Sequence, residues 1–435
     1  MKRSALFPIF ALCLSHFALS AHATKLDLSS LVDLKAANYA NLPYKNARNS
    51  QALYTENAIL GFVIKDIRLE KTLQSTMEVG VVLQSIGAGA SSATITAPQF
   101  ADAAERLPNA EGTPFIREAY VKIHKFIKPN ITATFGRQNF LLGQGITLSS
   151  DDLGLPGGRL EIANLYRGIK TDLFFFRPFN SLSFTNLYGG SASYPGNEGL
   201  WQIYHFWQRE TGAGRHLVFD TEAQTKKFTG VRYVLTQRLL AFDGEAVIQR
   251  GTAQKAGGAA TAYGGHAFML NGSWAQKIGF FGQSKLRLGY GRSSGNPGAG
   301  GTTDKAFFPA FGKKYKGLER SGYGEIAGAS LYDIIKTSPT ANGLPDGVSG
   351  MNLIAIGADL AYKQLLISAD IYKFRATSNA SGGSIQIASE WDIKVTCPLG
   401  ENLHLTAVYA VFTPLTLYTN PQQAKLVYGA ISAKF

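Results

Sequence analysis

Short segments in which apolar and polar residues alternate strictly are the feature that most constrains the fold of this chain. The clearest segment covers residues 384–396. Its apolar face holds Ile385, Ile387, Trp391 and Ile393. Its polar face holds Gln386, Glu390, Asp392 and Lys394. A repeat of two residues is the side-chain period of a β-strand, so the segment predicts a strand with one apolar face.

The same alternation recurs along the chain, in residues 75–84, 239–250 and 284–292. The polar faces of the last two segments hold Asp243, Glu245, Lys285 and Arg287. A soluble β-sandwich also alternates, with its apolar face turned inward, so the strands alone do not distinguish it from a membrane barrel. They do predict an all-β fold.

Hydropathy limits the ways in which such a chain could cross a membrane. Beyond the first 23 residues no stretch of about 18 apolar residues occurs, and the mean hydropathy is −0.03. A spanning structure would therefore have to be a β-barrel, because only helices and closed barrels pair all their backbone groups in lipid. The 47 Gly, 19 Tyr and 27 Phe fit a barrel with aromatic girdles and glycine-rich loops.

The breaks between strands alternate between tight turns and long loops. The tight turns fall at residues 236–237, 362–364 and 398–401. The glycine-rich loops fall at residues 251–261, 293–350 and 376–383. Short inner turns and long outer loops are typical of outer-membrane barrels, and the chain closes on a strand with the terminal aromatic Phe435. We expect a transmembrane antiparallel barrel of about 16–18 strands, although alternation does not define the strands between Gly189 and Lys226.

The N-terminus has the pattern of a cleaved secretory signal. Lys2 and Arg3 precede an apolar run and the small-residue exit Ala21-His22-Ala23. We expect cleavage after Ala23 and localisation in the bacterial outer membrane. Residues 24–51 lack clear alternation and are expected to be a periplasmic lead or a small plug, with the barrel at residues 52–435.

Motifs for catalysis or for metal binding are missing from the sequence. The histidines after the signal stand in no GxSxG or HExxH context. We therefore expect no catalytic residues, metal, cofactor or nucleic-acid partner. An outer-membrane hydrolase and a structural or adhesin barrel remain as the alternatives outside transport.

Two carboxylate pairs, Asp243 with Glu245 and Glu390 with Asp392, lie two residues apart on strand faces. The spacing would suit acid–base work or cation binding, but in a wide barrel cross-lumen ion pairs are favoured. We expect partners such as Arg232, Arg287 or Lys394 on neighbouring strands.

The loop at residues 293–350 carries an excess of basic residues. They are Lys305, Lys313, Lys314, Lys316 and Arg320. The sequence predicts a basic outer loop. These side chains would either be a charged stretch exposed to solvent or bind a polyanion or lipopolysaccharide phosphate.

Several short stretches, in order along residues 110–412, resemble the alginate-export family of outer-membrane porins. They are Arg117-Glu118-Ala119-Tyr120, Gly136-Arg137-Gln138, Tyr166-Arg167-Gly168-Ile169-Lys170, Gly230-Val231-Arg232, residues 245–251, residues 288–295, Phe308-Pro309-Ala310-Phe311-Gly312 and Glu390-Trp391-Asp392. The match departs at residues 293–296, where no acidic residue follows the Ser-Gly pair. A loop-held ion or substrate contact there is consequently not implied.

The resemblance implies a passive conduit of roughly 18 strands, with an arginine-rich lumen that passes an acidic polysaccharide. It makes an anionic saccharide the leading solute, with a general or small-solute porin as the alternative. The implied partners are outer-membrane lipid, lipopolysaccharide and the barrel-assembly machinery.

The net charge of the chain bears on whether the pore would favour anions or cations. Removal of Lys2 and Arg3 with the signal would lower the formal charge from +13 to +11, yet the polar faces that alternation defines are slightly acidic. The excess of basic over acidic residues must therefore lie in the loops and in those strands whose inward and outward faces cannot be identified from the alternation. We hypothesise that Arg137, Arg159, Arg167 and Lys170 form a constriction that favours anions.

Overall fold

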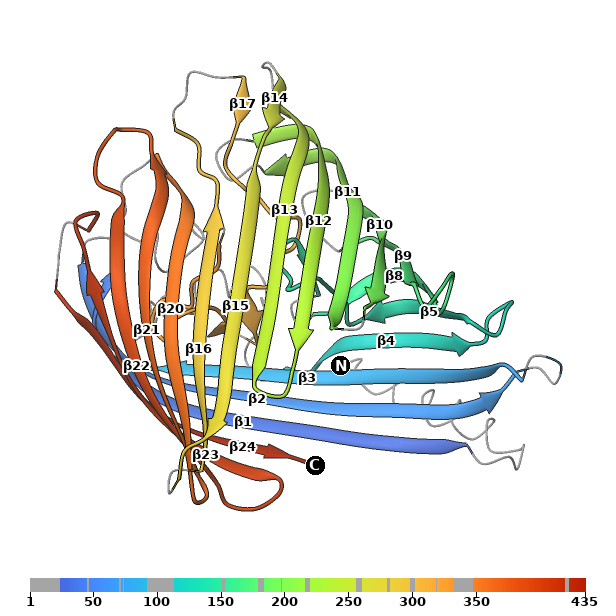
Figure 1. The fold of residues 1–435 in the computed structure, drawn as a ribbon, viewed down its shortest axis with the longest axis horizontal. Coiled ribbons are helices and arrows are strands. Elements are labelled where there is room, and N and C mark those ends of the chain that lie inside the picture. Colours follow the sequence, from blue (N-terminus) through green and yellow to red (C-terminus); the bar gives the residue numbers. More distant parts are fainter. Residues whose placement is uncertain are drawn as a thin grey trace, which may run out of the picture.

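The structure, a computed structural model, describes most of the chain after the predicted signal. The described residues are 24–44, 47–69, 72, 74–91, 113–150, 153–178, 184–196, 198–215, 220–255, 260–279, 282–297, 302–317, 319–331, 347–418 and 422–435. The regular elements in this part are β-strands (Figure 1). No helix within it has the length and apolar character needed to cross a membrane. Residues 1–23, with the predicted cleavage site, lie outside the described residues.

Eighteen strands form the wall of a closed antiparallel barrel. The first nine are β1 (Lys25–Tyr44), β2 (Ala47–Arg68), β3 (Thr76–Ala90), β4 (Phe115–His124), β5 (Ile131–Gln138), β8 (Leu155–Ile162), β9 (Lys170–Phe176), β10 (Phe184–Pro195) and β11 (Gly199–Arg215). The others are β12 (Asp220–Thr236), β13 (Leu240–Lys255), β15 (His266–Lys277), β16 (Gln283–Ser293), β20 (Val348–Tyr362), β21 (Leu365–Asn379), β22 (Gln386–Pro398), β23 (Leu403–Pro414) and β24 (Ala424–Lys434). Six short strands lie in the connections: β6 (Leu141–Leu142), β7 (Leu148–Ser149), β14 (Ala260–Tyr263), β17 (Thr303–Asp304), β18 (Tyr315–Lys316) and β19 (Glu319–Arg320).

The barrel closes between its first and last strands. β24 pairs with β1 from Lys425 opposite Ala40 to Lys434 opposite Leu31, and each other wall strand pairs with its neighbours in the chain. The prediction of an all-β antiparallel barrel is confirmed, and eighteen strands lie within the expected range. The region that alternation did not resolve, residues 189–226, contains parts of β10, β11 and β12.

The expectation of a periplasmic lead or plug at residues 24–51 is wrong. Residues 25–44 form β1 and residues 47–51 begin β2, and the two strands pair from Lys25 opposite Lys65 to Tyr44 opposite Ala47. Tyr39 is fully buried inside the barrel, and Leu31 lies on the same face of the strand. Because Leu31 faces inward while Ser30 faces outward, the apolar and polar faces are mixed at this point, and the alternation is hidden.

The two ends of the barrel differ in the length of their connections. At one end the strands are joined by turns such as residues 237–239, 363–364 and 399–402. The first residue of β1 and the last residue of β24 lie at this end. At the other end β16 and β20 are separated by residues 294–347. In outer-membrane barrels the short turns are periplasmic and the long loops extracellular, so we name these the short-turn end and the long-loop end.

The alternation read from the sequence assigns most side chains to the correct face. Leu286 and Leu288 are exposed on the outside, whereas Arg287 between them points into the lumen and binds two luminal carboxylates. Aromatic pairs lie on the outer face, with 4.4 Å between the ring centroids of Trp201 and Tyr233. Such outward aromatic residues are typical of the membrane boundaries of a barrel.

Strand β22 departs from the predicted faces at two positions. Gln386, predicted to face the lumen, lies opposite the outward Arg375 and accepts its hydrogen bond at 3.1 Å. Ile387 is fully buried, although its place in the alternation predicts contact with lipid. The register between β21 and β22 shifts here, because Phe374 faces Ala388 while the next residue, Arg375, faces Gln386. This β-bulge turns Ile387 inward and leaves Trp391 and Ile393 exposed outside as predicted.

Two long connections fold into the lumen instead of standing above the rim. We name them loop A (residues 139–150) and loop B (residues 302–331, of which residue 318 is not described). Their apolar side chains pack in one cluster with inward side chains of the wall. The cluster includes Phe140, Leu142, Leu148, Phe307, Ile326, Phe174, Phe206 and Phe228. The predicted basic outer loop is therefore in large part an inward loop, and Arg320 within it is buried.

Candidate pore constriction

Loop A is held against the wall by a buried carboxylate. Glu245 on β13 is 1 % exposed and accepts hydrogen bonds from the backbone N–H of Gln144 and from the hydroxyl of Tyr204 on β11. Arg232 on β12 donates to the carbonyl of Gly143 at 2.8 Å. Gly143 has φ of +62°, a conformation that glycine adopts without strain, and a side chain there would collide with the Glu245 carboxylate.

Loop B is held in the same way on the other side of the lumen. Glu390 on β22 accepts hydrogen bonds from the backbone N–H groups of Ile326 at 2.6 Å and Ala327 at 2.9 Å. Asp392 accepts from the N–H of Glu325 at 2.9 Å. Charge-assisted bonds of this kind stabilise both the buried carboxylate and the turn that donates to it.

Side chains of loop B complete its attachment. The Glu325 carboxylate accepts a hydrogen bond from the hydroxyl of Tyr428 on β24 and lies 3.6 Å from the ammonium of Lys394. Glu319 pairs with Lys35 on β1 at 2.7 Å. Loop B therefore bonds to strands β1, β22 and β24 on one side of the barrel. On another side, the hydroxyl of its Tyr323 donates a hydrogen bond to strand β15.

The two loops meet at Asn271 on β15. The Asn271 amide donates to the Gln144 side-chain oxygen of loop A at 2.8 Å, and its own oxygen accepts from the Tyr323 hydroxyl of loop B at 3.0 Å. Burial raises the pKa of Tyr323, which keeps the hydroxyl protonated as a donor. Backbone bonds join the loops a second time, including Lys313 N–H to the carbonyl of Gly145 at 2.8 Å. Together the loops form a partition across the lumen.

Most charged side chains on the luminal wall neutralise one another. The Arg232 guanidinium forms a bidentate ion pair with the Asp243 carboxylate, with hydrogen bonds of 2.8 and 2.6 Å. Arg287 contacts two carboxylates, Asp359 at 2.8 Å and Asp370 at 3.0 Å. These pairs fix the wall geometrically. The Arg232–Asp243 pair is neutral, whereas Arg287 with its two carboxylates leaves one net negative charge.

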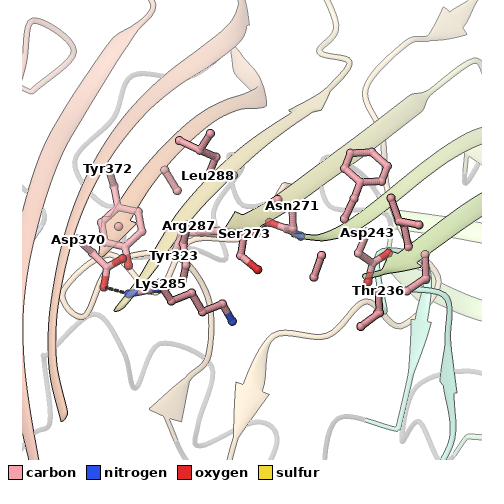
Figure 2. A pocket seen from close by; sticks show the side chains of 18 residues that line it. Thr236, Asp243, Asn271, Ser273, Lys285, Arg287, Leu288, Tyr323, Asp370 and Tyr372 are labelled. Carbon is pink, nitrogen blue, oxygen red and sulfur yellow. Dashed lines mark hydrogen bonds and ion pairs between the residues drawn. The ribbon is translucent and has the colours of Figure 1, made fainter. Parts of the chain in front are cut away.

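A cavity of about 280 Å³ lies beside the loop partition, on its short-turn side. Tyr323 and Asn271 border it, and its polar wall includes Asp243, Ser273 and Lys285. Figure 2 shows the ammonium of Lys285 extending away from the Asp370–Arg287 pair into the open space. Lys285 is exposed and makes no hydrogen bond or ion pair with the described residues. It is therefore a cation available to a passing solute.

The four basic residues predicted to form one constriction do not come together. Arg137 lies near the long-loop end of β5 and donates to the carbonyl of Ile116 at 3.2 Å. Arg167 lies in the turn at residues 163–169 at the short-turn end, where it covers the ring of Tyr166. Lys170 is exposed at the same end, at the start of β9.

Arg159 is the only one of the four that the structure places in a luminal ion-pair group. Its guanidinium lies 2.9 Å from Glu161 and 3.1 Å from Asp172. Its charge is therefore neutralised by the wall.

The expected ion pairs of the carboxylates are correct at one position and wrong at three. Asp243 pairs with Arg232 as predicted. Glu245, Glu390 and Asp392 instead accept backbone N–H groups from the inward loops. The alternation placed these carboxylates in the lumen but contained no information about loops distant in sequence.

Sequence reasoning missed the residues that join the loops. Gln144, Asn271 and Tyr323 are common polar residues in loop or strand contexts, with no motif around them. One signal of an inward loop was present: Glu390 was predicted to face the lumen, yet the residues opposite it on the neighbouring strands, Tyr372 and Phe412, are not basic. Among the described residues no group of three or more His, Cys, Asp or Glu side chains could hold a metal ion.

Comparison with known proteins gives similarity at the level of structure alone. No protein-family model and no curated protein sequence matches the chain. A BenF-like porin from Pseudomonas fluorescens Pf-5 superposes with a TM-score of 0.59 at 13% identity, covering 94% of this chain and 98% of that one. Pseudomonas aeruginosa OccK5 (OpdH) gives 0.54 at 10% identity with the same coverage.

A third similar structure was determined with a small ligand. It is Pseudomonas aeruginosa OpdK with vanillate, with a TM-score of 0.53, 10% identity, and coverage of 94% of this chain and 98% of that one. These neighbours are porins of the Occ/Opd and BenF-like kind, and they give no support to the resemblance to alginate-export porins. The chain therefore has the fold of these outer-membrane porins, a closed antiparallel barrel of 18 strands.

Proposed function

We propose that this chain is a passive outer-membrane porin for small solutes, and that small carboxylates are its preferred class. The observation that carries the proposal is the cavity beside the loop partition, where Lys285 makes no ion pair with a described residue while the arginines of the wall are paired. Asp359 faces Lys285 across the β16–β20 pairing, but its carboxylate bonds to Arg287. A free ammonium inside a narrow lumen attracts and orients a carboxylate by its local field.

The size of the passage favours a small solute over a polysaccharide. Loops A and B bond to each other and to opposite parts of the wall, so they obstruct a long chain. The cavity of about 280 Å³ lies just below the usual range of ligand pockets, roughly 300–1,000 Å³. The fold shared with OpdK, a porin whose structure contains vanillate, gives additional support to a small carboxylate.

Swelling of proteoliposomes tests the proposal with a matched pair of solutes. Glucose and glucuronate are close in size, but only glucuronate carries a carboxylate. We expect wild-type protein to pass glucuronate several-fold faster than glucose, and Lys285→Gln to remove the difference. The control Lys363→Gln, an exposed lysine in a short turn, should retain it.

Each failure has a distinct meaning. Equal rates for both sugars in wild-type protein would leave a general porin and overturn the carboxylate preference. No swelling with either sugar, from protein shown to be folded, would overturn the porin function itself and favour a structural barrel.

A further inference from the structure

A group of basic side chains stands on the outer surface of the barrel near its long-loop end. Arg209 on β11, Lys227 on β12 and Arg250 on β13 are exposed. Their chain neighbours Lys226 and Gln249 are buried inside. Since side chains alternate across a strand, the three exposed residues point away from the lumen. We name them the outer basic cluster.

The cluster holds like charges close together, with no carboxylate paired to them among the side chains that the structure describes. Lys227 lies directly opposite Arg250 in the β12–β13 pairing, where facing side chains are close and like charges repel. None of the three forms an ion pair with a described residue. The nearby Glu210 points inward, where it accepts a hydrogen bond from Gln224. An anion from outside the chain would relieve this repulsion.

Aromatic residues place the cluster at a membrane boundary. Trp207 lies opposite Lys227 and stacks on Tyr188, with 5.5 Å between ring centroids. The second aromatic pair, Trp201 with Tyr233, lies six residues earlier on β11, about 20 Å toward the short-turn end. The outward side chain of Ile203 between them is 59% exposed. The cluster therefore lies just beyond the apolar band, on the long-loop side.

Further exposed basic residues occupy corresponding places on other strands. Arg292 is near the long-loop end of β16, Lys373 on β21, and Lys425 on β24. Each lies on the outward face, because its chain neighbours Ser293, Phe374 and Ala424 are fully buried. The outer basic cluster is thus the densest part of a wider basic surface.

We propose that the outer basic cluster binds the phosphate groups of a phosphorylated glycolipid in the outer leaflet, of the lipid A type. Arginine forks match phosphate oxygens in geometry, and basic residues beside a membrane attract anionic headgroups. The aromatic rings of Trp207 and Tyr188 contact the region between sugar and acyl chains. This site lies outside the lumen and does not depend on the proposed function of the pore.

Native mass spectrometry of the folded barrel in detergent tests the site. The probes are lipid A with two phosphates, the same lipid A after phosphatase treatment, and phosphatidylglycerol. We expect wild-type protein to bind the phosphorylated lipid A at least about tenfold more tightly than either other lipid. The variant Arg209→Gln, Lys227→Gln, Arg250→Gln should lose that preference.

A matched variant controls for loss of charge. Lys128→Gln, Lys277→Gln, Lys363→Gln removes three exposed lysines at the short-turn end and should bind as the wild type does. Gel mobility with and without heating shows that each barrel is folded. Equal binding of both forms of lipid A, equal binding of phosphatidylglycerol, or unchanged binding by the cluster variant would each overturn the proposal.

Discussion

At the scale of single residues, buried carboxylates determine the position of the inward loops. Glu245 and Glu390 are each 1 % exposed, and both accept backbone N–H groups from chain segments that are distant in sequence. A buried carboxylate without such donors would be strongly destabilising, so wall and loop depend on each other. Their luminal orientation was predictable from alternation, whereas their partners were not, because no local pattern encodes contacts between a strand and a loop 101 residues away.

Replacing the anchor of loop A should loosen the constriction without unfolding the barrel. Glu245→Gln loses an acceptor for the Gln144 N–H and weakens the bond from Tyr204, at a cost of roughly 1–3 kcal/mol to the docked loop. We expect larger and noisier single-channel currents. Asp33→Asn on β1 is the control, since Asp33 makes no hydrogen bond or ion pair with a described loop residue, and its currents should match the wild type. Quiet, unchanged currents in Glu245→Gln would contradict the anchoring role.

At the scale of elements, strand faces were predictable wherever the alternation was unbroken. Strands β13 and β16 have their polar faces in the lumen as predicted. The faces were not predictable in β1, where Leu31 points inward, nor at the bulge in β22, where Ile387 is buried. In β22 one extra residue exchanges the faces, and the register with the neighbouring strand decides the outcome. In β1 the register is regular at Leu31, and an apolar residue on the inward face hides the alternation.

Strand β22 offers a direct test of its two faces. Ile393→Arg should lower the free energy of unfolding by about 2–4 kcal/mol, because the side chain meets lipid near the middle of the wall. Lys394→Gln, its neighbour on the luminal face, should change stability far less. Urea titrations of the barrel refolded in lipid vesicles measure both. Similar stabilities for the two variants would show that the faces are wrongly assigned.

At the scale of the whole molecule, the barrel closes where β24 and Phe435 meet β1. Phe435 exchanges two backbone hydrogen bonds with Ser30 on β1, at 2.8 and 2.9 Å, and its side chain is 71% exposed at the short-turn end. Deleting Phe435 should reduce the yield of heat-modifiable, folded barrel in the outer membrane. Phe435→Tyr retains an aromatic terminus and should assemble normally. Assembly of the deletion variant at the wild-type yield would rule out a role for the terminal residue.

The central claim is that the barrel is an open passage even though two loops cross its lumen. Single-channel recording in a planar bilayer tests it most directly. The proposed passage runs past the loops by way of the cavity beside them, so purified wild-type protein should produce uniform stepwise increases in current that persist at low voltage. A folded, inserted barrel that gives no current steps would show that loops A and B close the lumen, and would contradict the claim.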